Sequence, residues 1–263
     1  MLIDSNAYIG HWPFRQLKGN TCNGLLERMN QAGIDMSVIS NLNGIFYKNT
    51  QHANEELYDE IRSNKRFAGR FVPFAVINPI YNGWKDDLDV CVNKMGMKGI
   101  RLHPVYHGYE LNNPACIELV KLARDKNLVI AFSLRIVDSR PSSWLDVEKE
   151  LSLKDLVPIL KAVPDAKYLI LNVANSTTLS PEDLALFKST NLIMDTSGRN
   201  IANLGEMMLK FGKEKFAFGT HSPVLDYRTG LLRVESLRES EADAKTKELL
   251  RSGNIKRLLN LQV

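Results

Sequence analysis

The sequence lacks several features that would define a class of protein at once. It has three cysteines, Cys22, Cys91 and Cys116, which are odd in number and far apart, without a CxxC pair. This usage is typical of a reduced intracellular protein and argues against a disulfide framework or a cysteine-based zinc cluster. No apolar stretch approaches membrane-spanning length, and Asp4 and Asn6 interrupt the start, where a signal peptide would be apolar. We therefore expect a cytoplasmic protein without a membrane partner.

Concentrated charge is also missing. The net charge is +4, and the lysines and arginines are spread along 263 residues without a basic run, so no nucleic-acid partner is predicted. No GxGxxG or Walker A loop follows an apolar run, which disfavours dinucleotide-binding and P-loop folds. The chain contains 44% hydrophobic and 24% charged residues, as ordinary globular proteins do, and no linker divides it. We predict one domain over residues 1–263.

Short apolar runs alternate with longer helical patterns, as in parallel βα units. The predicted strands are Leu2–Asn6, Met36–Ser40, Arg70–Ile77, Gly99–His103, Leu128–Ser133, Tyr168–Asn172, Leu192–Asp195 and Phe216–Gly219. Helices are predicted at Gly24–Gln31, Ala53–Ser63, Asp86–Met95, Pro114–Lys126, Leu153–Lys161 and Pro181–Lys188. Eight strands in this length fit an α/β fold, a single (β/α)8 TIM barrel, better than an open sheet. The helical tail after residue 227 is expected to close the barrel.

Polar residues recur at the ends of the predicted strands. Alternate strand residues face a barrel's interior, and the carboxyl ends of the strands form its active-site face. This alternation places polar side chains on the inner side of six strands: Asp4, Asn6 and Tyr8; Arg101 and His103; Ser133 and Arg135; Asn172; Asp195; and His221. Because barrel interiors are otherwise apolar, these residues predict a binding or catalytic pocket.

Four motifs, in order along the chain, carry a resemblance to a known family. They are "IDSNAYIG", "KGIRLHP", "FGTHSP" and the terminal "GNIKRLL". Over nearly its whole length the chain resembles the amidohydrolase superfamily, specifically its amidohydrolase-2 (aminocarboxymuconate-semialdehyde decarboxylase-like) branch. The resemblance implies a TIM barrel with a divalent metal at the strand ends, where it activates water for hydrolysis or assists non-oxidative decarboxylation.

The positions at which the resemblance implies metal ligands hold other residues. Asn6 and Tyr8 replace the His-x-His of the first strand, Ser133 and Asn172 replace one histidine each, and His221 replaces the aspartate of the eighth strand. A catalytic zinc needs about three strong protein ligands, and only His221 qualifies. We therefore predict no metal cofactor. The alternative is zinc on a rearranged set of ligands, namely His103, His107, Asp195 and His221.

The leading hypothesis is a metal-independent hydrolase that acts on a small carboxylated substrate such as a lactone or ester. The superfamily includes lactonases that work without a metal on dicarboxylate lactones. In this hypothesis His221 is the general base, His103 assists the leaving group, and Asp195 orients His221 or acts as an acid. The structural alternatives are a His221 that donates to a neighbouring carbonyl, and an Asp195 that binds backbone in its own turn.

The other candidate residues would bind the substrate, which we predict to be an anionic small molecule. Arg101 suits a carboxylate, with a buried pair to Asp4 as the alternative. Asn6 and Asn172 would donate to the polarised carbonyl. Further contacts are predicted for Tyr8, Tyr106, His107, Ser133 and Arg135, with Arg15 and Arg199 adding positive charge and Trp12 and Phe14 an apolar lid.

Two other functions stay open at this stage. One is a catalytically inactive barrel that binds a small acid or a partner protein. The other is a metal-dependent hydrolase or decarboxylase with the rearranged ligand set. The sequence does not define the substrate, and it leaves a homo-oligomer open.

Overall fold

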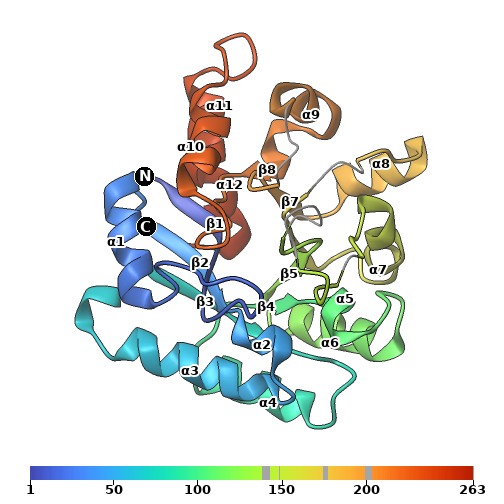
Figure 1. Ribbon diagram of the computed structural model, residues 1–263. Helices are drawn as coiled ribbons and strands as arrows, with labels where there is room; N and C mark the ends of the chain where they lie inside the picture. Colours follow the sequence, from blue (N-terminus) through green and yellow to red (C-terminus); the bar gives the residue numbers. More distant parts are fainter. Residues whose placement is uncertain (138–142, 148, 174–176, 199–202, 263) are drawn as a thin grey trace.

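The computed structural model describes residues 1–137, 143–147, 149–173, 177–198 and 203–262. Eight parallel strands stand in the sheet order β1 to β8 (Figure 1). The backbone also joins the two edges, because Ser5 N donates to Phe218 O and Tyr8 N donates to Ser222 O. The predicted TIM barrel is confirmed.

The elements alternate as a βα barrel requires. The strands are β1 Ile3–Ile9, β2 Met36–Asn41, β3 Phe71–Val76, β4 Gly99–Leu102, β5 Val129–Ser133, β6 Lys167–Leu171, β7 Leu192–Asp195 and β8 Phe216–Ala217. The helices are α1 Cys22–Ala32, α2 Asn43–Phe46, α3 Thr50–Arg62, α4 Trp84–Asn93, α5 Pro104–His107, α6 Pro114–Asp125, α7 Val157–Ala162, α8 Pro181–Ser189, α9 Leu204–Phe211, α10 Tyr227–Glu235, α11 Ala244–Glu248 and α12 Asn254–Leu259. Every predicted strand overlaps an observed one. Ser180 caps α8, with its side chain accepting from Asp183 N.

Two apolar layers hold the barrel together. The larger layer lies between the strands and the surrounding helices and includes Ile100, Ile130 and Phe132. The smaller one fills the barrel interior, where Val38 and Leu169 pack among alternate strand residues. Two side chains of α12, Ile255 and Leu258, belong to this interior cluster. The tail therefore closes the barrel, as predicted.

A β-bulge in β1 changes the phase of that strand. Ile3 and Asp4 pair with Met36 and Ser37, but the next pair is Ala7 with Ile39, so β1 carries one extra residue. Ile3 lies in the interior cluster, and Ala7 lies in the outer layer. The bulge separates Asp4 from Asn6, so the prediction that Asp4, Asn6 and Tyr8 share one face was wrong for Asp4.

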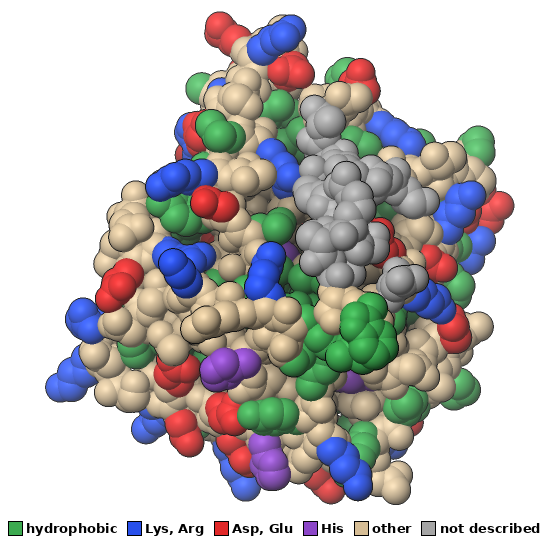
Figure 2. All heavy atoms as spheres, viewed as in Figure 1, with side chains coloured by type: hydrophobic (Ala, Val, Ile, Leu, Met, Phe, Trp, Pro, Cys, Tyr) green, Lys and Arg blue, Asp and Glu red, His purple; other side chains and the backbone are tan. Residues whose placement is uncertain are grey.

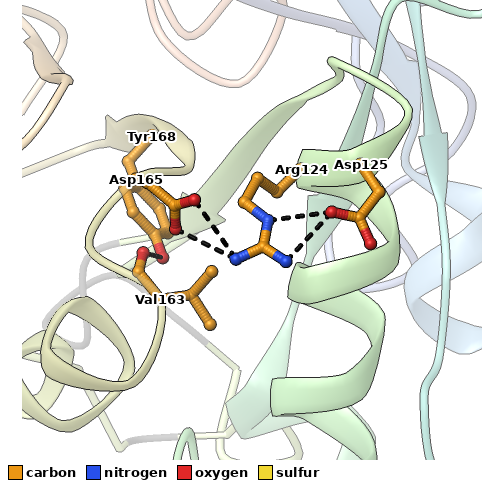
Figure 3. A network of polar contacts seen from close by, with 5 residues as sticks. All are labelled: Arg124, Asp125, Val163, Asp165 and Tyr168. Carbon is orange, nitrogen blue, oxygen red and sulfur yellow. Dashed lines mark hydrogen bonds and ion pairs between the residues drawn. The ribbon is translucent and has the colours of Figure 1, made fainter.

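Exposed ion pairs lie at the other end of the barrel. Figure 3 shows Arg124, in the last turn of α6, between Asp125 and Asp165, and Tyr168, which donates to Val163 O over 2.7 Å. Arg124 Nη1 donates to Asp165 Oδ1 over 3.1 Å, and Nε donates to Asp125 Oδ1 over 3.0 Å. The side chain of Arg124 is 32% exposed. This arginine is satisfied and solvated, unlike the arginine inside the barrel.

Candidate functional site

The carboxyl ends of the strands form a buried polar layer above the apolar interior. It contains ten polar or aromatic side chains, each at most 5% exposed: Asn6, Tyr8, Arg101, His103, Ser133, Asn172, Asp195, Ser197, Thr220 and His221. Two of these residues, Asn172 and His221, have left-handed backbone φ angles of 56° and 58°. Such angles are uncommon for residues other than glycine and occur often at functional sites. The structure therefore brings together most of the residues that the alternation predicted.

Asn6 joins β1 to the ends of β7 and β8. Its Nδ2 donates to Asp195 Oδ2 over 2.8 Å and lies 3.0 Å from both Ser197 Oγ and His221 Nδ1. Because this amide nitrogen already has three protein acceptors, it is not free to donate to a substrate carbonyl. The Nδ2 of Asn172 is also engaged, by the carbonyl oxygen of Arg135 at 2.9 Å. The predicted role of these two amides as donors to a substrate is not supported by their geometry.

His221 has protein partners at both ring nitrogens. Nε2 lies 2.7 Å from Ile136 O, which can only accept, and Nδ1 faces the donating amide of Asn6. These partners define a neutral ring with its proton on Nε2. Burial lowers the pKa of His221 to about 3, so the ring stays neutral at pH 7. This is the carbonyl-bonded arrangement that the sequence left open, and a role as general base would require one of these bonds to break.

Asp195 is fully buried and does not touch His221. Its carboxylate accepts from Asn172 N over 2.7 Å, from Asn6 Nδ2, and from the Ser197 hydroxyl. Burial raises the pKa of Asp195, which these hydrogen bonds partly offset. Asp195 therefore orients Asn6, which in turn holds His221.

The alternative pair between Asp4 and Arg101 is absent. The Asp4 carboxylate accepts from Thr220 N over 2.9 Å, from Thr220 Oγ over 2.5 Å and from Asn6 N over 3.0 Å. The β1 bulge explains this, because it directs Asp4 to the segment after β8. Burial raises the pKa of Asp4 to about 7. Asp4, the predicted partner of Arg101, therefore uses its carboxylate to accept hydrogen bonds from Thr220 and from the backbone of Asn6.

Arg101 is completely buried and poorly satisfied. Its guanidinium carbon lies 4.2 Å from the centroid of the Tyr8 ring, and Nη1 makes one long hydrogen bond of 3.4 Å to Ala7 O. Nε and Nη2 have no partner among the residues that the structure describes. A buried guanidinium normally has a carboxylate or several carbonyl partners, because an unpaired buried charge is costly. Nε and Nη2 therefore keep unused hydrogen-bond donors.

His103 is the second unsatisfied group. It follows β4 as the residue before α5 and is 1% exposed. Neither ring nitrogen has a hydrogen-bond partner within the described part of the chain. Burial, together with nearby His107 and Arg101, lowers its pKa well below the usual value, so the ring is neutral at pH 7. One nitrogen then carries a proton and can donate, and the other can accept.

The remaining predicted contacts surround these two residues. The Tyr8 hydroxyl lies 3.4 Å from Ser133 Oγ, and Tyr106 Oη donates to Asp146 Oδ1 over 3.1 Å. His107 Nε2 lies 3.2 Å from Gly44 O, which fixes that ring in the wall. The other arginines are occupied: Arg135 pairs with Glu150 at 2.6 Å, and Arg15 donates to Val224 O over 2.7 Å. Arg199 lies outside the described residues.

A small cavity of about 10 Å³ adjoins this layer. Six of its lining residues are His103, Tyr106, Ser133, Arg135, Asp146 and Glu150. The sequence analysis missed Asp146, because it lies in the stretch after β5 where no strand or helix pattern gives its direction. Its proximity to His103 comes only from the fold.

The described side chains at the carboxyl ends of the strands do not form a ligand set for a catalytic metal. Among the described residues there is no group of three His, Cys, Asp or Glu side chains that could hold one. In the rearranged set, His107 and His221 are bonded to carbonyls and Asp195 is occupied by three donors.

Aromatic rings cover the mouth beside α2 and α5. Trp12 packs edge-on against Phe14, Phe46 and Tyr106, with ring centroids 5.3 to 5.9 Å apart. The predicted wall of Trp12 and Phe14 is therefore present, with Phe46 added. On the face shown in Figure 2, hydrophobic side chains gather next to the residues drawn in grey. Phe46 is 41% exposed, so part of this aromatic cluster is in water.

Comparison with known proteins agrees with the fold. No protein-family model and no curated protein matches the chain. Among solved structures, 2,6-dihydroxybenzoate decarboxylase from Rhizobium is similar, with a TM-score of 0.72, 13% identity, and coverage of 100% of this chain and 99% of the other. Amidohydrolase 2 from Bifidobacterium longum subsp. infantis has a TM-score of 0.63 and 17% identity, with 99% coverage of both chains.

A third similar structure contains a bound acid. It is a probable 2-pyrone-4,6-dicarboxylic acid hydrolase from Acinetobacter baumannii with citric acid bound, at a TM-score of 0.67, 14% identity and 99% coverage of both chains. At these identities the likenesses show the fold, which is the one that the sequence motifs implied. None of the described helices is both long and apolar enough to cross a membrane.

Proposed function

We propose that this protein is a metal-independent hydrolase of a small carboxylated lactone or ester. The observation that carries the proposal is the buried Arg101, whose Nε and Nη2 have no partner among the described residues, near a buried His103 whose two ring nitrogens have none there either. A carboxylate pairs with a guanidinium through two parallel hydrogen bonds and would neutralise this charge. Both residues lie where the strands of a barrel end, which is where barrel enzymes bind their substrates.

In this proposal Arg101 binds the substrate's carboxylate and His103 polarises the carbonyl that reacts. A neutral imidazole donates one hydrogen bond to the developing oxyanion without becoming charged. His221, with both nitrogens engaged, holds the segment around Ile136 and the Asn6 amide in place. The similar folds support hydrolysis of an acid substrate, since one of these structures is named for a dicarboxylic acid hydrolase and another for an amidohydrolase. Cysteine usage supports a cytoplasmic location.

A second candidate is a barrel that binds a small acid without turning it over. The observation that favours it is His221, because a ring with two protein partners has no free nitrogen for proton transfer. The same Arg101 would bind the acid in both cases. Turnover, not binding, separates the two functions.

The test combines binding and turnover on metal-stripped protein. Succinate, citrate and 2-pyrone-4,6-dicarboxylic acid are titrated by calorimetry, and hydrolysis is followed with the pyrone and with 4-nitrophenyl hemisuccinate. Arg101→Met should abolish binding, and Arg124→Met is the matched control, an arginine whose contacts lie at the opposite end of the barrel (Figure 3). Binding without hydrolysis supports the second candidate. Unchanged binding by Arg101→Met refutes the site, and activity that returns only with added zinc or manganese refutes metal independence.

A further inference from the structure

Asp146 is a buried carboxylate with one unused oxygen. It is 7% exposed and lies on the segment that follows β5. Its Oδ1 accepts from Val147 N over 2.7 Å and from Tyr106 Oη over 3.1 Å. Its Oδ2 is buried and has no partner among the described residues. One oxygen is thus fixed by two donors, and the other is left free to accept a proton.

Asp146 and His103, each with an unpartnered polar atom, line one cavity. Its space of about 10 Å³ is also lined by Ser133 and Arg135. A space of that size fits one water molecule, which needs two to four polar partners. The polar side chains in the lining are candidates for these partners.

Apart from Arg101 and His103, the described acidic and basic groups of the polar layer are already occupied. Asp195 accepts from three donors, Asp4 accepts from three, and His221 is bonded at both nitrogens. Glu150 pairs with Arg135. Among the described carboxylates of the layer and its cavity, Asp146 therefore combines burial, an unused oxygen and a place in the lining of the cavity that His103 also lines.

We propose that Asp146 is the general base that deprotonates the hydrolytic water, an inference that rests on the proposed function. The water oxygen bonds to the acyl carbon while its proton passes to Asp146 Oδ2, and the carbonyl oxygen becomes an oxyanion that accepts a hydrogen bond from His103. When the intermediate collapses, the acyl C–O bond breaks. The leaving alkoxide takes the proton back from Asp146, which restores the carboxylate.

The experiment compares Asp146→Asn with the natural protein on 4-nitrophenyl hemisuccinate and 2-pyrone-4,6-dicarboxylic acid. Asparagine keeps an Oδ1 that accepts from Val147 and Tyr106, so the fold and the affinity for succinate should not change. We expect kcat/KM to fall about 10² to 10⁴-fold, the usual contribution of a positioned base. The activity loss at acid pH that reports protonation of the base should disappear. Asp146→Glu should recover part of the rate together with that pH dependence, and Asp125→Asn, an exposed carboxylate, is the control.

The outcomes separate this inference from the proposed function. If the natural protein hydrolyses neither probe, the proposed function fails and the inference fails with it. If the natural protein is active, Arg101→Met is inactive and Asp146→Asn keeps full activity, only the role of Asp146 is refuted. Loss of succinate binding in Asp146→Asn would also refute it, because the carboxylate would then act in binding or in local structure.

Discussion

Replacing Arg101 with methionine should stabilise the protein while removing its ligand. Methionine keeps an unbranched side chain of similar reach in the apolar surroundings and introduces no charge. The reasoning is that a residue selected only for stability would not leave a buried guanidinium with two nitrogens unpaired. Binding sites often carry such a cost in the absence of ligand.

The size of the effect follows from the contacts of Arg101. Two buried unpaired nitrogens cost about 1–3 kcal/mol each, or roughly 2–6 kcal/mol together. The cation–π stack on Tyr8 at 4.2 Å stabilises the folded protein by about 2 kcal/mol, and the 3.4 Å hydrogen bond to Ala7 O stabilises it by about 1 kcal/mol or less. Subtracting these two contributions from the cost leaves roughly −1 to +4 kcal/mol, so Arg101→Met is expected to raise the free energy of unfolding by about 1.5 kcal/mol, the middle of that range, without ligand.

Urea unfolding at pH 7, with and without citrate, measures both parts of the prediction. A ligand at 100 times its Kd should stabilise the natural protein by about 2.7 kcal/mol and the variant not at all. Arg124→Met should change stability little, because exposed ion pairs contribute little. If Arg101→Met lowers the free energy of unfolding by more than about 2 kcal/mol in the absence of ligand, the guanidinium is a structural group and the reasoning is wrong.

Three further predictions concern single residues. Asp4 has a pKa of about 7 in the fold but about 4 when unfolded, so stability should fall as pH rises between these values. Relative to the natural protein, Asp4→Asn should gain about 4 kcal/mol in urea unfolding between pH 4 and 8, because each of the three pKa units corresponds to about 1.4 kcal/mol; a constant difference would contradict this. Gly198→Ala should lower the melting temperature, because its Cβ would lie 1.7 Å from Val173 O; an unchanged value would show that the loop adapts. His221→Ala should cost about 3 kcal/mol in thermal or urea unfolding but leave turnover, whereas a folded, inactive variant would restore His221 as the base.

The barrel was predictable because its signals are local. Short β-branched runs alternate with amphipathic stretches, and each run became a strand within a few residues of its expected ends. The inward positions of Arg101, His103, Ser133 and Asp195 followed from strict alternation along short, regular strands. The short helix α9 was not predicted, because its pattern in Leu204–Phe211 gives no clear starting residue.

The alternation failed where the backbone departs from regular geometry. No glycine or proline in β1 indicates the bulge, so the sequence does not predict it. The predicted direction of the Asp4 side chain was wrong for this reason. His221 lies after the end of β8, where its backbone is in the left-handed conformation. The alternation of strand residues therefore does not determine which groups its side chain contacts. Its hydrogen bond to Ile136 joins residues 85 positions apart, and no sequence pattern reports that contact.

Charge balance within the polar layer explains which residues remain for chemistry. Asp4 and Asp195 each accept from three donors, so these two carboxyl groups hold the ends of β1, β7 and β8. Burial raises the pKa of Asp195 and the charge of Arg101 acts against this through space, but Arg101 forms no ion pair with either carboxyl group. Because Asp4 and Asp195 are engaged and Arg101 keeps unused donors, the site favours a ligand that carries a carboxylate. Asp146 lines the same cavity as His103 and has one oxygen without a described partner, so proton transfer is the role that fits it.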